Sequence, residues 1–463
     1  MKFEKTVLVH FVSKFIAVVI GFFGTVYFAR TVGAGTLGTY FLILGVIMML
    51  NKLGSIGVRT ATTKYLSEDQ DPSYVAAGFT VQLGIYILLS IGIVVLRRQI
   101  NQYVGTEIAY TLLFLLFLRV SLSMLYGILD GEKKVHVSSV ISSTETITRT
   151  GIQAAGVYFG YKLTALLFGY TASMLAAIVT ALYFVSVRVV SPTFKQIRNL
   201  LNYVKYAWLG GARSVSFAWM DTLVLGLFVS NNLIGVYEIA WMASSLLAIL
   251  GNAISRVLLP EISSKHAQDR DISGIMSKSV GYAGFLLIPG IVGGFILGKQ
   301  FLLIYGAEFV AGYHILVILM LARLIYAYQQ QYLTGLNAVN RPDLSFRTSG
   351  AFLIINIILN FSLISLIGWT GAAIATAVSA GVGFVISNRY ISKLVNVQFP
   401  LSFIGKQCLA ASVMGGCLIG ATQISSESLP VLITLVGVGA AIYLGLLSVI
   451  SDDFRTVLLD NFP

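Results

Sequence analysis

The residues best suited to chemistry in this sequence are basic side chains that interrupt long apolar stretches. Five of them lie inside such stretches: Lys14, Arg119, Arg149, Arg213 and Arg323. A charge at the centre of a bilayer costs on the order of 2.5 to 3.5 kcal/mol, so these side chains should face protein or water. Three acids accompany them in or at the ends of the stretches: Glu145, Asp221 and Glu238. The excess of positive charge favours an anionic ligand, which arginine binds through its forked donors.

Each basic residue also has a structural explanation. Glu145 and Arg149 are four residues apart, so they lie on one helix face and are able to pair. Arg213 and Asp221 are eight apart, too far for a direct pair on one helix. Lys14 lies near the end of its stretch, where a lysine can reach the interface. The positions of three more candidates are also explained by a cytoplasmic excess of basic residues: Lys52, Arg59 and Arg256.

Uncharged polar side chains form a second group of candidates. Eight hydroxyl residues lie between Ser138 and Thr150, more than a lipid-facing helix needs, and they suggest a wet face around Glu145. Gln330 lies in a run of tyrosines and glutamines that suits sugar hydroxyls and sugar rings. Asn356 lies four residues before Asn360, on the same helix face. A simpler interpretation is that these two side chains make contacts between helices.

The composition places all these residues in a membrane. Hydrophobic residues make up 57% of the 463 residues and charged residues 11%, whereas soluble domains carry about 25% charged residues. Apolar runs of roughly 20 residues span a bilayer. The net charge of +12 is spread between the runs, so it indicates topology and not nucleic-acid binding. The first run is too long for a signal peptide.

We expect an all-α integral membrane protein with about fourteen transmembrane helices. Their expected ranges are 7–29, 39–58, 75–96, 108–129, 136–160, 163–187, 203–229, 234–259, 279–298, 310–339, 345–367, 369–391, 403–421 and 429–450. With the N-terminus inside, cytoplasmic segments hold 21 of the 31 lysines and arginines and outer loops hold five. Positive residues near helix ends stay in the cytoplasm, so we expect both termini there.

An internal repeat divides the chain. The segment from Leu37 to Arg59 recurs 197 residues later as the segment from Ile234 to Arg256, with glycines in register at 54 and 251. We therefore expect two six-helix lobes, residues 1–190 and 200–395, and an additional helix pair with a tail in 400–463. Six helices per copy is an even number, so the lobes should be related by a pseudo-two-fold axis along the membrane normal.

The run Phe28 to Phe41 (FARTVGAGTLGTYF), with the segment Lys52 to Arg59, resembles the polysaccharide-transporter (O-antigen flippase) family of the multidrug/oligosaccharidyl-lipid/polysaccharide exporter superfamily. The resemblance implies a MATE-like fold, an alternating-access cleft and a lipid-linked oligosaccharide carried from the inner to the outer leaflet. It makes the polyprenyl diphosphate the expected anion. Drug exporters of the superfamily use an acid in the first helix, whereas this helix carries Lys14.

We therefore expect a flippase in the cell membrane, with a cationic cleft and with membrane lipid and glycan-assembly proteins as partners. One alternative is a cation-coupled exporter of drugs or metabolites. Another is a membrane glycan polymerase or ligase, which should have a large outer loop. No metal-ligand cluster, catalytic triad or phosphate loop is visible, and the four histidines are scattered, so we expect no enzymatic activity and no cofactor.

Overall fold

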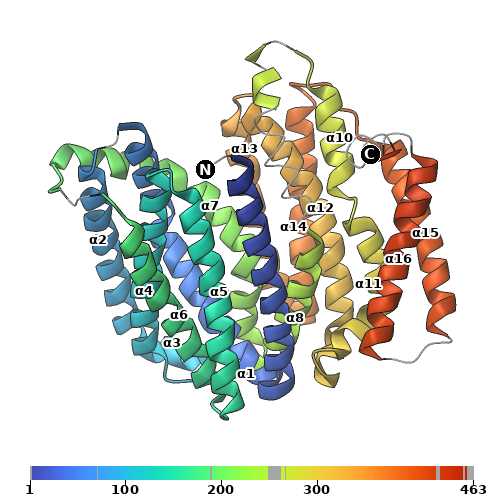
Figure 1. Ribbon diagram of the computed structural model, residues 1–463, viewed down its shortest axis with the longest axis horizontal. Coiled ribbons are helices and arrows are strands. Elements are labelled where there is room, and N and C mark those ends of the chain that lie inside the picture. The colour runs from blue at the N-terminus through green and yellow to red at the C-terminus, as the bar shows by residue number, and fades with distance from the viewer. Residues whose placement is uncertain are drawn as a thin grey trace. The chain divides into compact units, whose positions relative to one another are not determined.

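The computed structural model describes residues 3–69, 71–187, 190–248, 262–265, 267–268, 270–423, 428–451 and 454–455. It divides into two compact units, residues 1–235 and 236–463. The described residues form helices joined by short loops (Figure 1). Large apolar side chains lie exposed along them, among them Leu88 at 69% and Val95 at 71%. Lipid accounts for such a surface, which water does not favour.

The first unit holds α1 to α7 and the start of α8. Their bounds are α1 Phe3–Asp69, α2 Ser73–Val95, α3 Arg97–Val104, α4 Ala109–Gly131, α5 Val135–Tyr158, α6 Lys162–Phe184, α7 Phe194–Phe228 and α8 Asn231–Ser245. α1 packs against α4, α5 and α7, and α5 packs along α6 (Figure 1). α1 covers both of the first two expected helices. They meet at Gly33, whose φ of 79° breaks the helix where a side chain would be strained.

The second unit holds the rest of α8 and the helices that follow. These are η1 Leu246–Ala248, α10 Ser273–Ala283, α11 Leu287–Leu303, η2 Ala307–Gly312, α12 Tyr313–Ala338, α13 Pro342–Ile367, α14 Thr370–Ile391, α15 Leu401–Thr422 and α16 Leu429–Ile450. The helix expected at 279–298 is divided between α10 and α11. α15 and α16 pack together and against α11.

Ten helical segments of the described chain are long and apolar enough to cross a membrane. α5 is not among them, because its hydroxyl residues lower its hydropathy. In the part of α7 whose side chains are described, the shorter stretch Val215–Phe228 is apolar. The expectation of an all-helical, multi-pass membrane protein is confirmed. The count of fourteen spans stays a prediction.

The backbone supports the internal repeat. Three positions with positive φ in the first unit recur in the second at offsets of 201, 207 and 208 residues. The pairs are Gly105 and Gly306, Lys133 and Asn340, and Gly160 and Gly368. Each residue lies in a loop where the expected repeat has a turn. The two six-helix lobes, residues 1–190 and 200–395, stay a prediction. The expected equivalence of the glycines at 54 and 251 stays a prediction, because residue 251 lies outside the described residues.

Candidate functional site

Three helices of the first unit bring an arginine and an acid together inside the apolar region. Arg119 of α4 places Nη1 3.4 Å from Oε1 of Glu145 on α5. Tyr126, two turns after Arg119, donates its hydroxyl to Oε2 of the same carboxylate at 2.9 Å. The Glu145 side chain is 7% exposed and that of Arg119 is 25% exposed. Tyr170 of α6 lies buried beside them.

A second ion pair continues this group toward the end of α4. Arg59 of α1 donates from Nη2 to Oδ2 of Asp130 at 2.9 Å, and its guanidinium lies 5.8 Å from the ring centre of Tyr126. Ser138 of α5 donates its hydroxyl to Oδ1 of Asp130 at 2.6 Å. Tyr126 therefore contacts both ion pairs and links α1, α4 and α5.

Arg149 does not pair with Glu145, contrary to the expectation from their spacing. Its guanidinium lies 5.9 Å from the ring centre of Tyr170 instead. The reason is that α4 supplies both partners of the Glu145 carboxylate. Two buried polar atoms in this group have no hydrogen-bond partner among the described residues, Nε of Arg119 and the hydroxyl of Tyr170. The group therefore has unused hydrogen-bonding capacity.

Lys52 completes the set. Lys52 is exposed, and it interacts electrostatically with Arg59 and Arg119. We call the set the basic cluster: Lys52, Arg59, Arg119 and Arg149 with the two acids Asp130 and Glu145. Four cations against two carboxylates leave two positive charges in excess. Four of the eight basic residues that the sequence singled out are thus brought together in one unit.

Arg323 lies in the second unit, where α8 holds it. Its Nε donates to the Ser244 hydroxyl at 2.8 Å, and Nη2 contacts the Ser245 hydroxyl and donates to the Trp241 carbonyl at 3.4 Å. The guanidinium lies 4.2 Å from the ring centre of Trp241. Trp241, Ser244 and Ser245 are spaced at i, i+3 and i+4, so they lie on one face of α8. Arg323 is 8% exposed, so this helix face serves as its polar environment.

The other acids and amides fall in different places. Asp221 on α7 and Glu238 on α8 are buried, and both have interaction partners. Gln330 is half-buried. Asn356 of α13 is fully buried and donates to Thr376 of α14 at 3.5 Å, as expected of a contact between helices.

Three expected residues cannot be placed. Arg256 lies outside the described residues, as do the side chains of Lys14 and Arg213.

Sequence reasoning missed three residues of the basic cluster and its surroundings. Asp130 was overlooked because it follows the predicted end of its helix by one residue. Tyr126 and Asp130 are four apart, so they share a helix face, and this spacing is the signal that could have revealed them. Tyr170 offers no local signal, because no charged residue lies within a turn of it on α6.

Glu145 also lines a cavity of about 240 Å³ between α5 and α6. The cavity extends along α5 from His136 to Thr148, and α6 contributes Ser173 and Thr180. Most of its lining is apolar, so the expected wet face of α5 stays a prediction. Glu145 therefore faces the basic cluster on one side and a mostly apolar cavity on the other.

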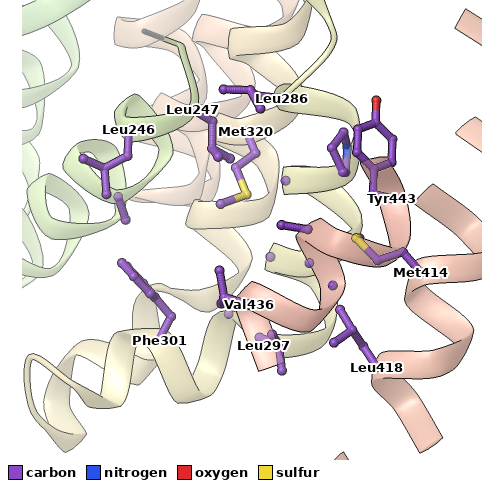
Figure 2. Close-up of a pocket in the computed structure, with 18 of the residues that line it drawn as sticks. Leu246, Leu247, Leu286, Leu297, Phe301, Met320, Met414, Leu418, Val436 and Tyr443 are labelled. Atoms are coloured by element: carbon purple, nitrogen blue, oxygen red, sulfur yellow. The ribbon is translucent and has the colours of Figure 1, made fainter. Parts of the chain in front are cut away.

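An apolar cavity of about 370 Å³ lies within the second unit, among α8, α11, α12, α15 and α16 (Figure 2). Figure 2 shows Leu297 and Phe301 of α11 with Met320 of α12, and Met414 of α15 on the other side. Glycines of α11 leave room in it, and a Cβ at Gly293 would meet nothing within 4 Å. Its lining suits a hydrocarbon chain. No cluster of three metal-ligating residues occurs in the described part of the chain.

Comparison with known proteins gives a consistent picture. The family model for polysaccharide biosynthesis proteins matches residues 27–312. The chain is 32% identical to "Probable flippase AglR" of Haloferax volcanii, over 94% of this chain and 93% of that protein. It is 28% identical to "Probable low-salt glycan biosynthesis flippase Agl15" of the same organism, over 88% of each.

Solved structures show the same fold. The lipid II flippase MurJ in an inward closed conformation matches 97% of this chain and 100% of its own, with a TM-score of 0.81 at 15% identity. An inward-facing multidrug resistance MATE transporter matches 81% of this chain and 95% of its own, with a TM-score of 0.62 at 14% identity. The MATE-like fold expected from the sequence is confirmed.

Proposed function

The chain belongs to the polysaccharide biosynthesis protein family, and on that premise we propose that it is a flippase for a lipid-linked oligosaccharide. It moves a glycan carried on polyprenyl diphosphate from the cytoplasmic to the outer leaflet by alternating access. The relatives named as flippases support this activity, and they are transporters rather than enzymes.

The observation that carries the proposal is the charge of the basic cluster. A sugar linked through diphosphate to a polyprenol carries two negative charges, because each phosphorus has one ester bond and one bridging anhydride oxygen and so keeps one ionised oxygen. The cluster has an excess of two positive charges, supplied mainly by arginines with donors to spare. Arginine binds phosphate oxygens in bidentate fashion, so the cluster suits this group in both charge and geometry.

The apolar cavity of the second unit, taken by itself, suits a hydrocarbon chain. Its lining is hydrocarbon almost throughout, and a polyprenyl chain has nothing to hydrogen-bond. A chain in the cavity replaces lipid contacts with protein contacts. The cavity by itself therefore suits the chain of a carrier lipid.

The distribution of basic residues supports an orientation in the cell membrane with both termini on the cytoplasmic side. Glycan-assembly proteins are the expected partners in the same membrane. Single cysteines at Glu427 and Asp452, in a background without Cys408 and Cys417, test the topology. An impermeant thiol reagent added outside should label only the first. Labelling of the second alone would reverse the assignment.

Reconstitution tests the function. Liposomes containing the protein and a fluorescent polyprenyl-diphosphate oligosaccharide should expose inner-leaflet label to an external quencher faster than empty liposomes. Arg119→Gln should slow this exposure at least tenfold, whereas Arg389→Gln, which alters an exposed arginine of α14, should leave it unchanged. Equal rates with and without protein would refute the flippase. Transport of small cationic drugs instead would favour the exporter, and glycan elongation would favour the polymerase.

A further inference from the structure

A surface cavity of about 890 Å³ lies in the first unit, between α3 and the start of α4. Arg97 and Arg98 line it side by side, together with the amides of Asn101 and Gln102 and the ring of Tyr110. These residues are separate from the basic cluster. Adjacent arginines with amide donors beside them suit a phosphate group, which arginine binds through forked, charge-assisted hydrogen bonds.

The cavity lies where the lipid-facing surface of the first unit ends. α2 leads directly into α3, and its last residues Val94 and Val95 are exposed, as is Leu96. Phe114, one turn into α4 from Tyr110, is exposed as well. Exposed apolar side chains of spanning helices face acyl chains, whereas arginine and tyrosine at their ends lie at the level of the lipid head groups. The cavity therefore opens at the depth of the lipid phosphates.

Topology does not account for the two arginines. α3 lies at the opposite end of the first unit from the start of α1 (Figure 1), so with the N-terminus in the cytoplasm, as proposed, it lies at the outer leaflet. The expected outer loops hold five of the 31 lysines and arginines, and Arg97 and Arg98 are two of those five. The positive-inside bias depletes outer loops of basic residues. An anionic ligand gives these adjacent arginines a reason to be there.

The turn between α3 and α4 is firmly held. Asn101 accepts hydrogen bonds from the backbone N–H groups of Ile108 and Ala109 at 3.0 and 2.9 Å, so a side chain of α3 caps the start of α4. On the other face of α3, Tyr103 donates its hydroxyl to the Leu223 carbonyl of α7. The cavity is therefore formed in advance, and a ligand does not have to order the loop.

The charges of the cavity leave one cation in excess. Arg97 donates from Nη1 to the Tyr110 hydroxyl at 2.7 Å, which fixes its guanidinium. Arg98 is exposed and forms no hydrogen bond or ion pair with any residue that the structure describes, so its donors are free. Glu107, the acid of the cavity, accepts a hydrogen bond from the Asn101 amide. Two arginines against one carboxylate leave a single positive charge, as one lipid phosphate requires.

We infer that the cavity between α3 and α4 binds a phosphate group carried by a lipid of the outer leaflet. Arg98 offers its free donors, Arg97 supplies the second charge, and Gln102 adds an amide. A membrane phospholipid and the lipid-linked glycan after its transfer present the same ionised phosphate oxygens at this depth. The site goes beyond the flippase activity itself, and its placement in the outer leaflet rests on the proposed orientation.

A fluorophore in the cavity tests the inference. Gln102→Cys, in a chain without Cys408 and Cys417, carries an environment-sensitive label. The full chain in neutral detergent is titrated with short-chain phosphatidylglycerol, with a short polyprenyl-diphosphate sugar, and with a diacylglycerol, which lacks phosphate. We expect a saturable change with a phosphate lipid and none with the diacylglycerol. A response to phosphatidylglycerol alone assigns the site to membrane lipid, and a response to the diphosphate sugar alone assigns it to the transported lipid.

Variants of Arg98 show whether the response depends on the arginine. Arg98→Gln should weaken binding roughly fivefold, the effect of one basic residue at a membrane surface. Arg98→Lys should weaken it less, because lysine keeps the charge but loses the fork. Lys162→Gln is the matched control, since it removes an exposed basic residue from another expected outer loop. Unchanged affinity in Arg98→Gln, or an equal response to the diacylglycerol, would overturn the inference.

The orientation and the flippase activity are tested separately from the site. An impermeant thiol reagent should reach the unlabelled Gln102→Cys chain from outside the cell, and labelling from the cytoplasmic side alone would overturn the placement in the outer leaflet. Binding in detergent requires no transport. A phosphate response from a protein that moves no glycan in liposomes would therefore support the site while refuting the flippase.

Discussion

Arg59 of α1 and Asp130 of α4 form an ion pair of 2.9 Å in which both side chains keep contact with solvent, at 40% and 22% exposure. An ion pair this accessible contributes about 0–1 kcal/mol to stability. Arg59 also faces the ring of Tyr126, so its place is fixed by more than the pair. We therefore expect Arg59 to contribute more to ligand binding than to stability.

A charge swap tests that conclusion. Arg59→Gln should lower flippase activity about tenfold or more with a change in thermal midpoint of only a few degrees. The double variant Arg59→Asp with Asp130→Arg should restore the pair and the midpoint but not the transport rate, since the cation moves from α1 to α4. Transport restored along with stability would show that the pair is structural.

The apolar cavity allows a test by filling. Gly293 lies inside α11 and faces open space, so Gly293→Leu should fill the cavity without a clash and favour the helix. We expect a thermal midpoint at or above that of the natural protein and a reduced transport rate for long polyprenyl carriers. Gly437→Leu is the matched control, because Gly437 of α16 also faces open space but does not line the cavity. Equal transport by both variants would exclude the cavity as a chain site.

Much of this architecture could be predicted from the sequence because the bilayer imposes it. Apolar length reveals α2, α4 and α6 within a few residues. It separates the two halves of α1, but it predicts a loop at 30–38, where the two helices instead meet directly at the kink of Gly33. The interruption between α10 and α11 is equally hidden, because Gly284 and its neighbours are as apolar as the helices.

The candidate site was predicted in its residue types but not in its pairings. Spacing along one helix suggested Glu145 with Arg149, whereas the partners come from α4. Pairing across helices depends on how each helix is rotated about its axis, and the sequence of a mostly apolar helix such as α6 gives little indication of that rotation. Arg323 shows the same limit: its cost in lipid was evident, but its partners on α8 were not.

Acid sensitivity is expected at the turn before α2. The backbone N–H and the hydroxyl of Ser73 donate to Asp71 at 2.9 and 2.6 Å, and Gln196 of α7 donates at 3.0 Å. These bonds, those of Ser73 foremost, hold the pKa of Asp71 below its ordinary value of 3.8. Because the folded-state pKa is the lower one, the stabilisation is present above the ordinary value. It is lost as the pH falls through the folded-state pKa.

Asp71→Asn should therefore lower the thermal midpoint at pH 7, and the difference from the natural protein should shrink as the pH falls below about 4. Asp271→Asn is the control. Asp271 accepts the corresponding bonds from Ser273 but is exposed, so its effect should be smaller. A difference for Asp71→Asn that persists unchanged at low pH would show that the carboxylate charge is not its source.

Arg323 distinguishes a ligand-binding arginine from one that positions a helix. The sequence favours an anionic ligand at this arginine, and a ligand-binding arginine predicts that glutamine abolishes export at normal protein abundance and that lysine stays partly active. The structure predicts otherwise, because Arg323 is buried against Trp241, Ser244 and Ser245. Lysine keeps the charge but loses the planar stack and the forked donors, and each lost hydrogen bond to a charged group costs about 1.5–3 kcal/mol.

We therefore expect Arg323→Gln and Arg323→Lys both to lower the thermal midpoint by several degrees, with transport falling in proportion to folded protein. Arg119→Lys should lower the thermal midpoint less than Arg323→Lys does, because the Arg119 side chain is less buried and its ion pair is long. Thermal denaturation in detergent and transport per folded molecule give the two readouts. If Arg323→Gln keeps the natural midpoint and still loses transport, Arg323 binds the substrate as the sequence suggested, and α8 holds it ready for the ligand.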